Sequence, residues 1–186
     1  MRRFVFKDTG LYGLKRIERQ SLGDNRGFLS RLFCIEELSR AGWHKPIKQI
    51  NHTYTAERGT VRGLHYQLPP YTEMKLVSCI RGEVWDLVVD LRAGSPTFLC
   101  VYVERLSADN GVALLIPDGC AHGFQALTDH VELIYCHSEA YAPLAEAGLN
   151  PKDPKLDIRW PLPITEISER DTQHPILEEN FTGLTL

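Results

Sequence analysis

Three side chains that can move a proton or stabilise negative charge lie close together in the first half of the chain. Arg62, His65 and Lys75 fall in one segment that has the pattern of strand, turn and strand. Histidine has an unperturbed pKa of roughly 6.5, so it can accept and return a proton near neutral pH. A neighbouring arginine or lysine can hold an anion or stabilise a developing oxyanion. The cluster predicts that His65 acts as a base beside a bound anion.

The spacing places a condition on this site. Along an extended strand, Arg62 and His65 would point to opposite faces. Both can serve one pocket only if Gly63 marks a bulge or a bend. Lys75 begins a strand after a proline-containing turn, a position that also suits an exposed lysine at a strand end.

Other candidates lie further along the chain. His122 belongs to a second probable strand, and we expect it to face His65 inside a β-barrel. Tyr135 alternates with apolar residues, which suits either a core residue or an acid whose hydroxyl has a partner. Asp171 could orient a histidine as carboxylates do in catalytic triads, or begin a helix.

A metal site is not expected. Metal-binding cupin barrels use two histidines one residue apart, then a glutamate and a later histidine, but Gln67 stands where the second histidine belongs. His65, Glu73 and His122 could supply three ligands, yet the first half of the motif is broken. The five cysteines show no CxxC spacing, which indicates neither a zinc knuckle nor a disulfide framework. Free thiols are typical of the reducing cytoplasm.

Composition narrows the class of protein. The chain has 186 residues, of which 43% are hydrophobic and 24% charged, values typical of a folded domain. We expect residues 1–186 to form a single domain. The net charge of -3 argues against a nucleic-acid-binding protein. No apolar run is long enough to span a membrane, and the start of the chain lacks the features of a signal peptide.

Period-two alternation dominates the middle of the chain. Trp85, Leu87 and Val89 share one face of a strand, whereas Asp86 and Val88 share the other. Further strands are expected around 14–17, 28–33, 47–54, 75–80, 98–105, 112–116, 122–127 and 131–137. Many short strands at regular spacing predict a β-sandwich or barrel.

Two segments depart from this pattern. Residues 35–42 predict one short helix that ends at Gly42. Residues 142–186 are rich in proline and weakly periodic, which indicates loops and short helices. Because this segment contains Ile158 and Trp160, we expect it to pack on the barrel.

Several motifs together resemble those of the dTDP-4-dehydrorhamnose 3,5-epimerases. The shared features are short runs of glycine, proline, charged and aromatic residues in a fixed order over about residues 12–178. The motifs are Asp24-x-Arg26-Gly27-Phe28, Arg62-Gly63-Leu64-His65-Tyr66-Gln67, Lys75-Leu76-Val77, Arg81-Gly82-Glu83-Val84, Gly94-Ser95-Pro96-Thr97-Phe98, Pro117-x-Gly119-x-Ala121-His122-Gly123-Phe124, Asp153-Pro154 and Ile158-x-Trp160-Pro161. Each motif alone is weak, but their combination is highly specific.

The resemblance implies a mainly β, cupin-type jelly-roll barrel with a few short helices, mostly C-terminal. It also implies a homodimer that uses no metal and no cofactor and acts on nucleotide-diphospho-4-keto-6-deoxy sugars. A C4 ketone acidifies the hydrogens at C3 and C5, so a base can remove one and an acid can return a proton to the other face.

Roles for individual residues also follow from the resemblance. His65 is implied to be the base, Asp171 its orienting partner, Tyr135 the acid and Lys75 the cation beside the enolate. The residues implied to bind substrate are Arg26 and Arg62 at the diphosphate, Gln49 and Asn51 at nucleotide and sugar, Tyr141 stacked on the nucleotide base, and His122 and Glu146 in the pocket.

Three residues depart from the family's pattern. Arg31 and Arg170 are still expected to bind substrate, and Arg31 and Ile50 fall where the identity of the nucleotide could be read. Arg31 stands where the family usually has a glutamate, Ile50 where it has an aspartate, and Arg170 where it has a lysine. Exchanging a carboxylate for a guanidinium reverses acceptor and donor roles, so Arg31 leaves a CDP- or GDP-linked sugar as an alternative. The sequence also leaves open whether C3, C5 or both are inverted. The competing functions are a 3,4-ketoisomerase, a metal-dependent oxygenase and a non-catalytic sugar-nucleotide binder.

Overall fold

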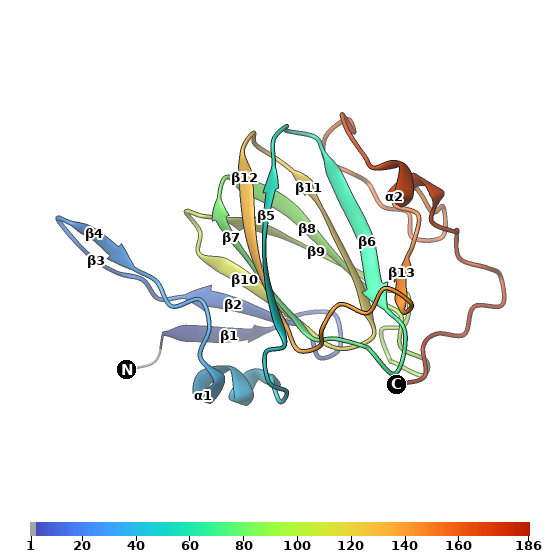
Figure 1. The fold of residues 1–186 in the computed structure, drawn as a ribbon, viewed down its shortest axis with the longest axis horizontal. Helices are drawn as coiled ribbons and strands as arrows, with labels where there is room; N and C mark the ends of the chain where they lie inside the picture. Colours follow the sequence, from blue (N-terminus) through green and yellow to red (C-terminus); the bar gives the residue numbers. More distant parts are fainter. Residues whose placement is uncertain (1–2) are drawn as a thin grey trace.

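Two antiparallel sheets form the body of the computed structural model, which describes residues 3–186 (Figure 1). One sheet has six strands in the spatial order β1 (Phe4–Asp8), β2 (Lys15–Arg19), β10 (Val112–Ile116), β7 (Lys75–Arg81), β12 (Val131–His137) and β5 (Gln49–Thr55). The other has five, in the order β13 (Glu146–Gly148), β6 (Val61–Gln67), β11 (Cys120–Ala126), β8 (Glu83–Asp90) and β9 (Val101–Ser107). The predicted jelly-roll barrel is confirmed.

Alternation along β8 explains how the strand serves two cores. Val84 and Val88 contribute to the apolar core that both sheets share. Leu87 and Val89 point the other way and pack under the C-terminal segment. There, the rings of Trp85 and Trp160 meet edge to face with centroids 5.4 Å apart. The part of the C-terminal segment that carries Trp160 therefore contacts β8.

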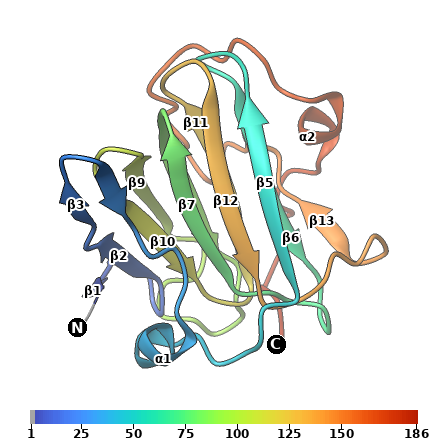
Figure 2. The ribbon, with the colours of Figure 1, turned by 60° about the vertical axis from the view of Figure 1, so that its left-hand side comes forward.

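The helices are short. α1 (Ile35–Leu38) continues into the 3₁₀ helix η1 (Ser39–Ala41), and Gly42 ends this turn with a φ of 109°. Both lie below the six-stranded sheet in Figure 2. α2 (Glu169–Gln173) is the one helix described in the C-terminal segment, and Ser168 caps it through the amide of Asp171. Among residues 3–186, no helix is both long and apolar enough to cross a membrane.

A hairpin projects from the body of the molecule. β3 (Leu22–Asp24) and β4 (Gly27–Leu29) pair only with each other and extend away from the barrel (Figure 1). The side chains of Leu22, Phe28 and Leu29 are exposed, with Phe28 at 75%. The hairpin thus presents apolar side chains to solvent.

The bend predicted at Gly63 is present. His65 pairs with His122 and Arg62 pairs with Phe124, so two residues of β6 oppose one residue of β11. Gly63 has a φ of 121°, a conformation that other residues rarely adopt. The extra residue turns both Arg62 and His65 toward one cavity.

Replacing Gly63 with alanine is expected to lower the free energy of unfolding by about 2–5 kcal/mol. An added Cβ would stand 2.6 Å from the Cα of Gly123 and 2.8 Å from the carbonyl oxygen of His122, and backbone cannot move aside cheaply. Urea unfolding measures the loss. Gly42→Ala is the matched control, because Gly42 also has a positive φ but has nothing within 4 Å of the new Cβ. Equal losses in both variants would contradict the role of the close approach.

Candidate active site

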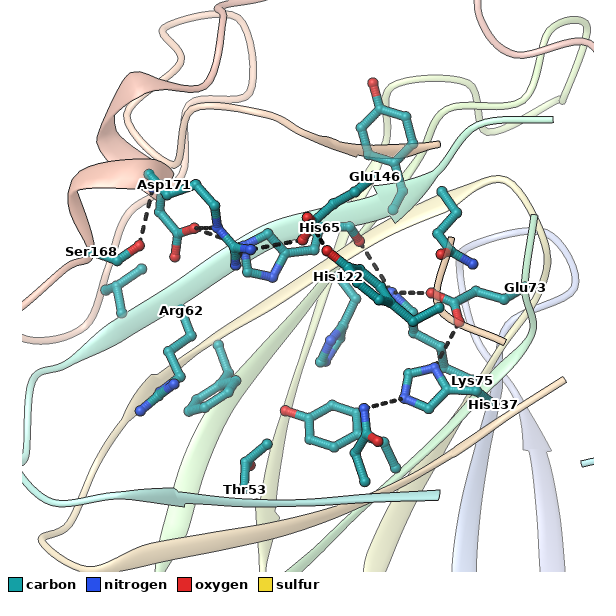
Figure 3. Close-up of a pocket in the computed structure, with 18 of the residues that line it drawn as sticks. Thr53, Arg62, His65, Glu73, Lys75, His122, His137, Glu146, Ser168 and Asp171 are labelled. Atoms are coloured by element: carbon teal, nitrogen blue, oxygen red, sulfur yellow. Dashed lines mark hydrogen bonds and ion pairs between the residues drawn. The ribbon is translucent and has the colours of Figure 1, made fainter. Parts of the chain in front are cut away.

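A cavity of about 560 Å³ opens among strands of both sheets, β13 and α2 (Figure 3). All but two of the site residues predicted from sequence line it. These are His65, Tyr135, Asp171, Lys75, Gln49, Asn51, Arg62, His122, Tyr141, Glu146 and Arg170. The fold therefore brings together residues from six strands, from α2 and from the loop that carries Tyr141.

His65 and Asp171 form a hydrogen-bonded pair at one wall of this cavity. Nε2 of His65 lies 2.7 Å from Oδ1 of Asp171, and the amide of Gly63 donates to Oδ2 at 3.1 Å. Burial alone would raise the pKa of Asp171, but the bonds from His65 and Gly63 outweigh it and lower the pKa to about 2. Asp171 is thus a carboxylate that accepts the Nε2 proton of His65, and the ring keeps a lone pair on Nδ1.

A chain of contacts leads from this pair to the mouth of the cavity. Arg170 places Nη2 3.2 Å from Nε2 of His65 and Nη1 2.7 Å from Oε1 of Glu146. The hydroxyl of Tyr141 donates to Oε2 of Glu146 at 2.7 Å. Because Arg170 and Tyr141 are both exposed, these groups can rearrange around a ligand.

The ammonium of Lys75 is buried on β7, across the cavity from α2. Its Nζ lies 3.2 Å from the backbone carbonyl oxygen of His65 and 3.1 Å from Oε1 of Glu73. Nδ1 of His137 lies 2.7 Å from Oε2 of Glu73 (Figure 3). Burial would raise the pKa of Glu73, but Lys75 and His137 lower it. A cation is therefore fixed within reach of the base.

Tyr135 and His122 line the inner part of the cavity. Nε2 of His122 lies 3.0 and 2.9 Å from the two carboxylate oxygens of Asp86, which is fully buried. The rings of His122 and Tyr135 meet edge to face at 5.8 Å. Burial and the nearby charge of Asp86 raise the pKa of Tyr135, so the phenol keeps its proton. A protonated donor and a base thus face the same space.

Arg62, Gln49 and Asn51 form another part of the wall. Arg62 donates through Nε to Oγ1 of Thr55 at 3.1 Å and through Nη2 to the carbonyl oxygen of Tyr54 at 3.2 Å. These bonds use only some of its donors, so others remain for an anion. Nε2 of Gln49 donates to Oδ1 of Asn51 at 3.0 Å, which fixes two amides on one face of β5.

Two predicted site residues do not join the cavity of their own chain. Arg26 lies at the tip of the β3–β4 hairpin, where Nη2 bonds Oδ2 of Asp24 at 2.6 Å. Arg31 pairs with Glu37 at 2.8 Å, outside the cavity. Ile50 is also outside, because alternation along β5 turns it to solvent. Within one chain, therefore, neither Arg31 nor Ile50 lines the cavity.

Sequence reasoning missed several residues of the site. His137 shares a strand face with Tyr135, so alternation along β12 would have found it. Asp86 stands out as a charge among the inward-facing valines of β8. His174 gave no such signal, because it follows α2 in an irregular segment. Its ring packs 5.8 Å from that of His65, and burial together with His65 lowers the pKa of His174.

Acid is expected to weaken the fold partly through Asp171. An aspartate has a pKa of roughly 3.9 when unfolded, and that of Asp171 is about 2 when folded. A depressed carboxylate pKa contributes stability above the unfolded value, and this contribution is lost as pH falls from about 4 to about 2. In Asp171→Asn, the decline of unfolding free energy over this window should shrink by about 2 kcal/mol. Urea titrations at each pH measure it, and identical slopes in both proteins would contradict the assignment.

Comparison with known proteins agrees with this geometry. The family model described as dTDP-4-dehydrorhamnose 3,5-epimerase matches residues 8–179. A dTDP-4-dehydrorhamnose 3,5-epimerase from Sinorhizobium fredii is 37% identical, with 94% of this chain and 90% of the relative covered. A dTDP-4-dehydrorhamnose 3-epimerase from Streptomyces niveus is 36% identical over 93% of this chain and 84% of the relative.

Comparison with a solved structure identifies the same family. The dTDP-4-dehydrorhamnose 3,5-epimerase from Bacillus anthracis, with TDP and PPi bound, superposes with a TM-score of 0.90 at 36% identity. The alignment covers 94% of this chain and 99% of that one. A shared fold, shared sequence and near-complete coverage lead to one conclusion: the chain belongs to the dTDP-4-dehydrorhamnose 3,5-epimerase family, whose members are enzymes that act on nucleotide sugars.

Proposed function

We propose that the chain inverts C3, C5 or both in a dTDP-linked 4-keto-6-deoxyhexose, in the biosynthesis of a deoxysugar. The observation that carries the proposal is the His65–Asp171 pair at 2.7 Å, set in a cavity that Lys75 and Tyr135 also line. A carbon next to a ketone can lose a proton when a base, a cation for the enolate and an acid converge. This site holds one group of each kind.

Each group has one step. Nδ1 of His65 takes the proton from the carbon, and Asp171 stabilises the imidazolium that forms. The ammonium of Lys75 stabilises the enolate oxygen at C4. Tyr135 returns a proton to the opposite face, which leaves the configuration inverted.

The remaining lining residues bind the substrate. Arg62 supports a diphosphate through its unused guanidinium donors, as arginine commonly does. Gln49 and Asn51 present amides to nucleotide and sugar, while His122 contacts the sugar. At the mouth of the cavity, Tyr141 stacks on the nucleotide base. Glu146 and Arg170 rearrange so that the nucleotide can enter.

Deuterium incorporation tests this function. The chain is incubated in heavy water with dTDP-, CDP- and GDP-linked 4-keto-6-deoxyglucose, and NMR follows C3 and C5. We expect label with the dTDP sugar. If label entered only the CDP- or GDP-linked sugar, that nucleotide would replace dTDP in the proposed substrate. A product whose carbonyl has moved from C4 to C3 would indicate a 3,4-ketoisomerase. No label at either carbon in any sugar contradicts the function.

We also propose a homodimer of single-domain chains, located in the cytoplasm. The exposed apolar hairpin supports pairing, because Leu22, Phe28 and Leu29 have no contact that would bury them in their own chain. In a pair, the hairpin of one copy would cover the partner's cavity and bring Arg26 to the diphosphate. The five free cysteines suit a reducing compartment.

Replacing Phe28 with aspartate is expected to weaken the dimer by roughly tenfold or more, because a buried unpaired charge costs at least 1.4 kcal/mol, or about that factor. Sedimentation over a range of concentrations measures the change. Tyr12→Asp is the control, since Tyr12 is also exposed, at 62%, but lies between β1 and β2 and outside the cavity. A monomeric parent chain, or equal weakening by both variants, would contradict the proposal.

A further inference from the structure

A second use of the His65–Asp171 pair follows from the residue beside it. Nε2 of His174 lies 3.8 Å from Oδ1 of Asp171, the oxygen that Nε2 of His65 contacts at 2.7 Å. The three ligand atoms all lie within 4.8 Å of one another. Among residues 3–186, this is the one group of three or more such side chains. Nothing in the epimerase chemistry calls for His174.

The nitrogen of His174 has no partner that explains its position. It is buried, and it makes no hydrogen bond to any residue that the structure describes. Its ring packs over Gly148, where an added Cβ would come within 2.3 Å of Nε2. A buried polar atom without a partner costs free energy, so a nitrogen held toward a carboxylate and a second imidazole indicates a bound ligand.

We propose that a Zn²⁺ ion binds to His65, Asp171 and His174 and switches the enzyme off. Two imidazoles and a carboxylate are a common donor set for zinc with an open fourth position. Two atoms bonded to one tetrahedral zinc stand roughly 3.4 Å apart, and small rotations of the three side chains reach that spacing. Two of the three ligands, His65 and Asp171, line the cavity, which gives the ion its path of entry.

The chemistry of binding balances without another reactant. His65 changes tautomer: the Nε2 proton passes through water to Nδ1, so the ring stays neutral and the lone pair on Nε2 takes the metal. Asp171, already a carboxylate, keeps its oxygen on the ion instead of on the imidazole. Nδ1, the proposed base atom, then carries a proton and has no free lone pair, so proton removal stops. Inhibition rests on the proposed function, whereas binding does not.

One group opposes the ion. The guanidinium of Arg170 lies 3.2 Å from Nε2 of His65 and 3.5 Å from Oδ1 of Asp171. Its side chain is 55% exposed and also paired with Glu146, so it can move fully onto Glu146. Removing this charge should strengthen binding, while removing the His174 nitrogen should weaken it. Opposite effects from two neighbours are the signature of this site.

Calorimetric titration of the full chain with Zn²⁺ tests the proposal. The wild type should bind one ion per chain. His174→Phe keeps an aromatic ring over Gly148, and His174→Ala is a second variant in case phenylalanine does not fit there. Both variants should bind Zn²⁺ at least roughly tenfold more weakly than the wild type. Arg170→Gln should bind more tightly. His52→Gln is the control, because Nε2 of His52 meets Glu132 at 2.8 Å on the surface without a third ligand, and it should bind as the wild type does.

Two results would overturn the proposal: no saturable binding by the wild type, or equal affinity in the wild type and both His174 variants. A parallel assay follows label exchange with and without Zn²⁺, then after a chelator is added. We expect reversible inhibition of the wild type, and His174→Phe should keep its own metal-free rate at the same Zn²⁺ concentration. If the chain exchanges no label even without metal, the proposed function fails, and the titration still decides the zinc site.

Discussion

Replacing His65 with glutamine is expected to slow deuterium incorporation at C3 and C5 by ~10³-fold. Glutamine keeps a polar side chain of similar reach beside Asp171 but has no basic nitrogen. Without the imidazole, only water can take the proton, and the cation at Lys75 has no enolate to stabilise. NMR of the dTDP-linked sugar in heavy water gives the rate at each carbon.

His52→Gln is the matched control for this experiment. His52 also pairs with a carboxylate, Glu132, but its side chain is 54% exposed and lies outside the cavity. The control should exchange label at the wild-type rate. Thermal unfolding of both variants separates lost chemistry from lost fold. If His65→Gln exchanged label within a few-fold of the wild type, His65 would not be the base.

Replacing Tyr135 with phenylalanine should separate proton removal from inversion. The hydroxyl is the proposed proton donor, and its raised pKa keeps that proton in place until the enolate forms. Phenylalanine preserves the ring that packs against His122 at 5.8 Å. Label should therefore still enter the unchanged substrate from the side of His65, while inverted product falls by ~10²-fold.

The measurement compares label in recovered substrate with the yield of inverted sugar. Tyr12→Phe is the control, because the Tyr12 side chain is exposed and lies outside the cavity. If both quantities fell together in Tyr135→Phe, the tyrosine would support the site rather than donate the proton. If neither fell, another acid would be required.

The strands were predictable where alternation and turns agree. The ranges 112–116 and 131–137 match β10 and β12 because a turn precedes each run and inward positions are apolar. β9 begins at Val101 rather than 98, since residues 96–99 form a turn that starts at Pro96. β1 was not predicted, because a short terminal strand gains its order from pairing with β2 rather than from its own pattern.

Some features of the site could likewise be predicted from the sequence, and others could not. The bend at Gly63 could be inferred, because only a change of register lets Arg62 and His65 serve one pocket. The contact between His65 and Asp171 crosses 106 residues, and no local periodicity encodes such a distance. Resemblance supplied that pair. It could not supply His174, whose position depends on how an irregular segment packs.

The bond from Lys75 to the backbone carbonyl of His65 has a consequence for engineering. Base and counter-charge share one anchor on the main chain, so a shift that carries the imidazole toward a differently shaped sugar also draws the ammonium along. Substitutions at the mouth of the cavity should therefore leave the distance between the His65 imidazole and the Lys75 ammonium nearly unchanged. Libraries that vary Tyr141 and its flanking loop should therefore broaden the range of accepted sugars while turnover is retained.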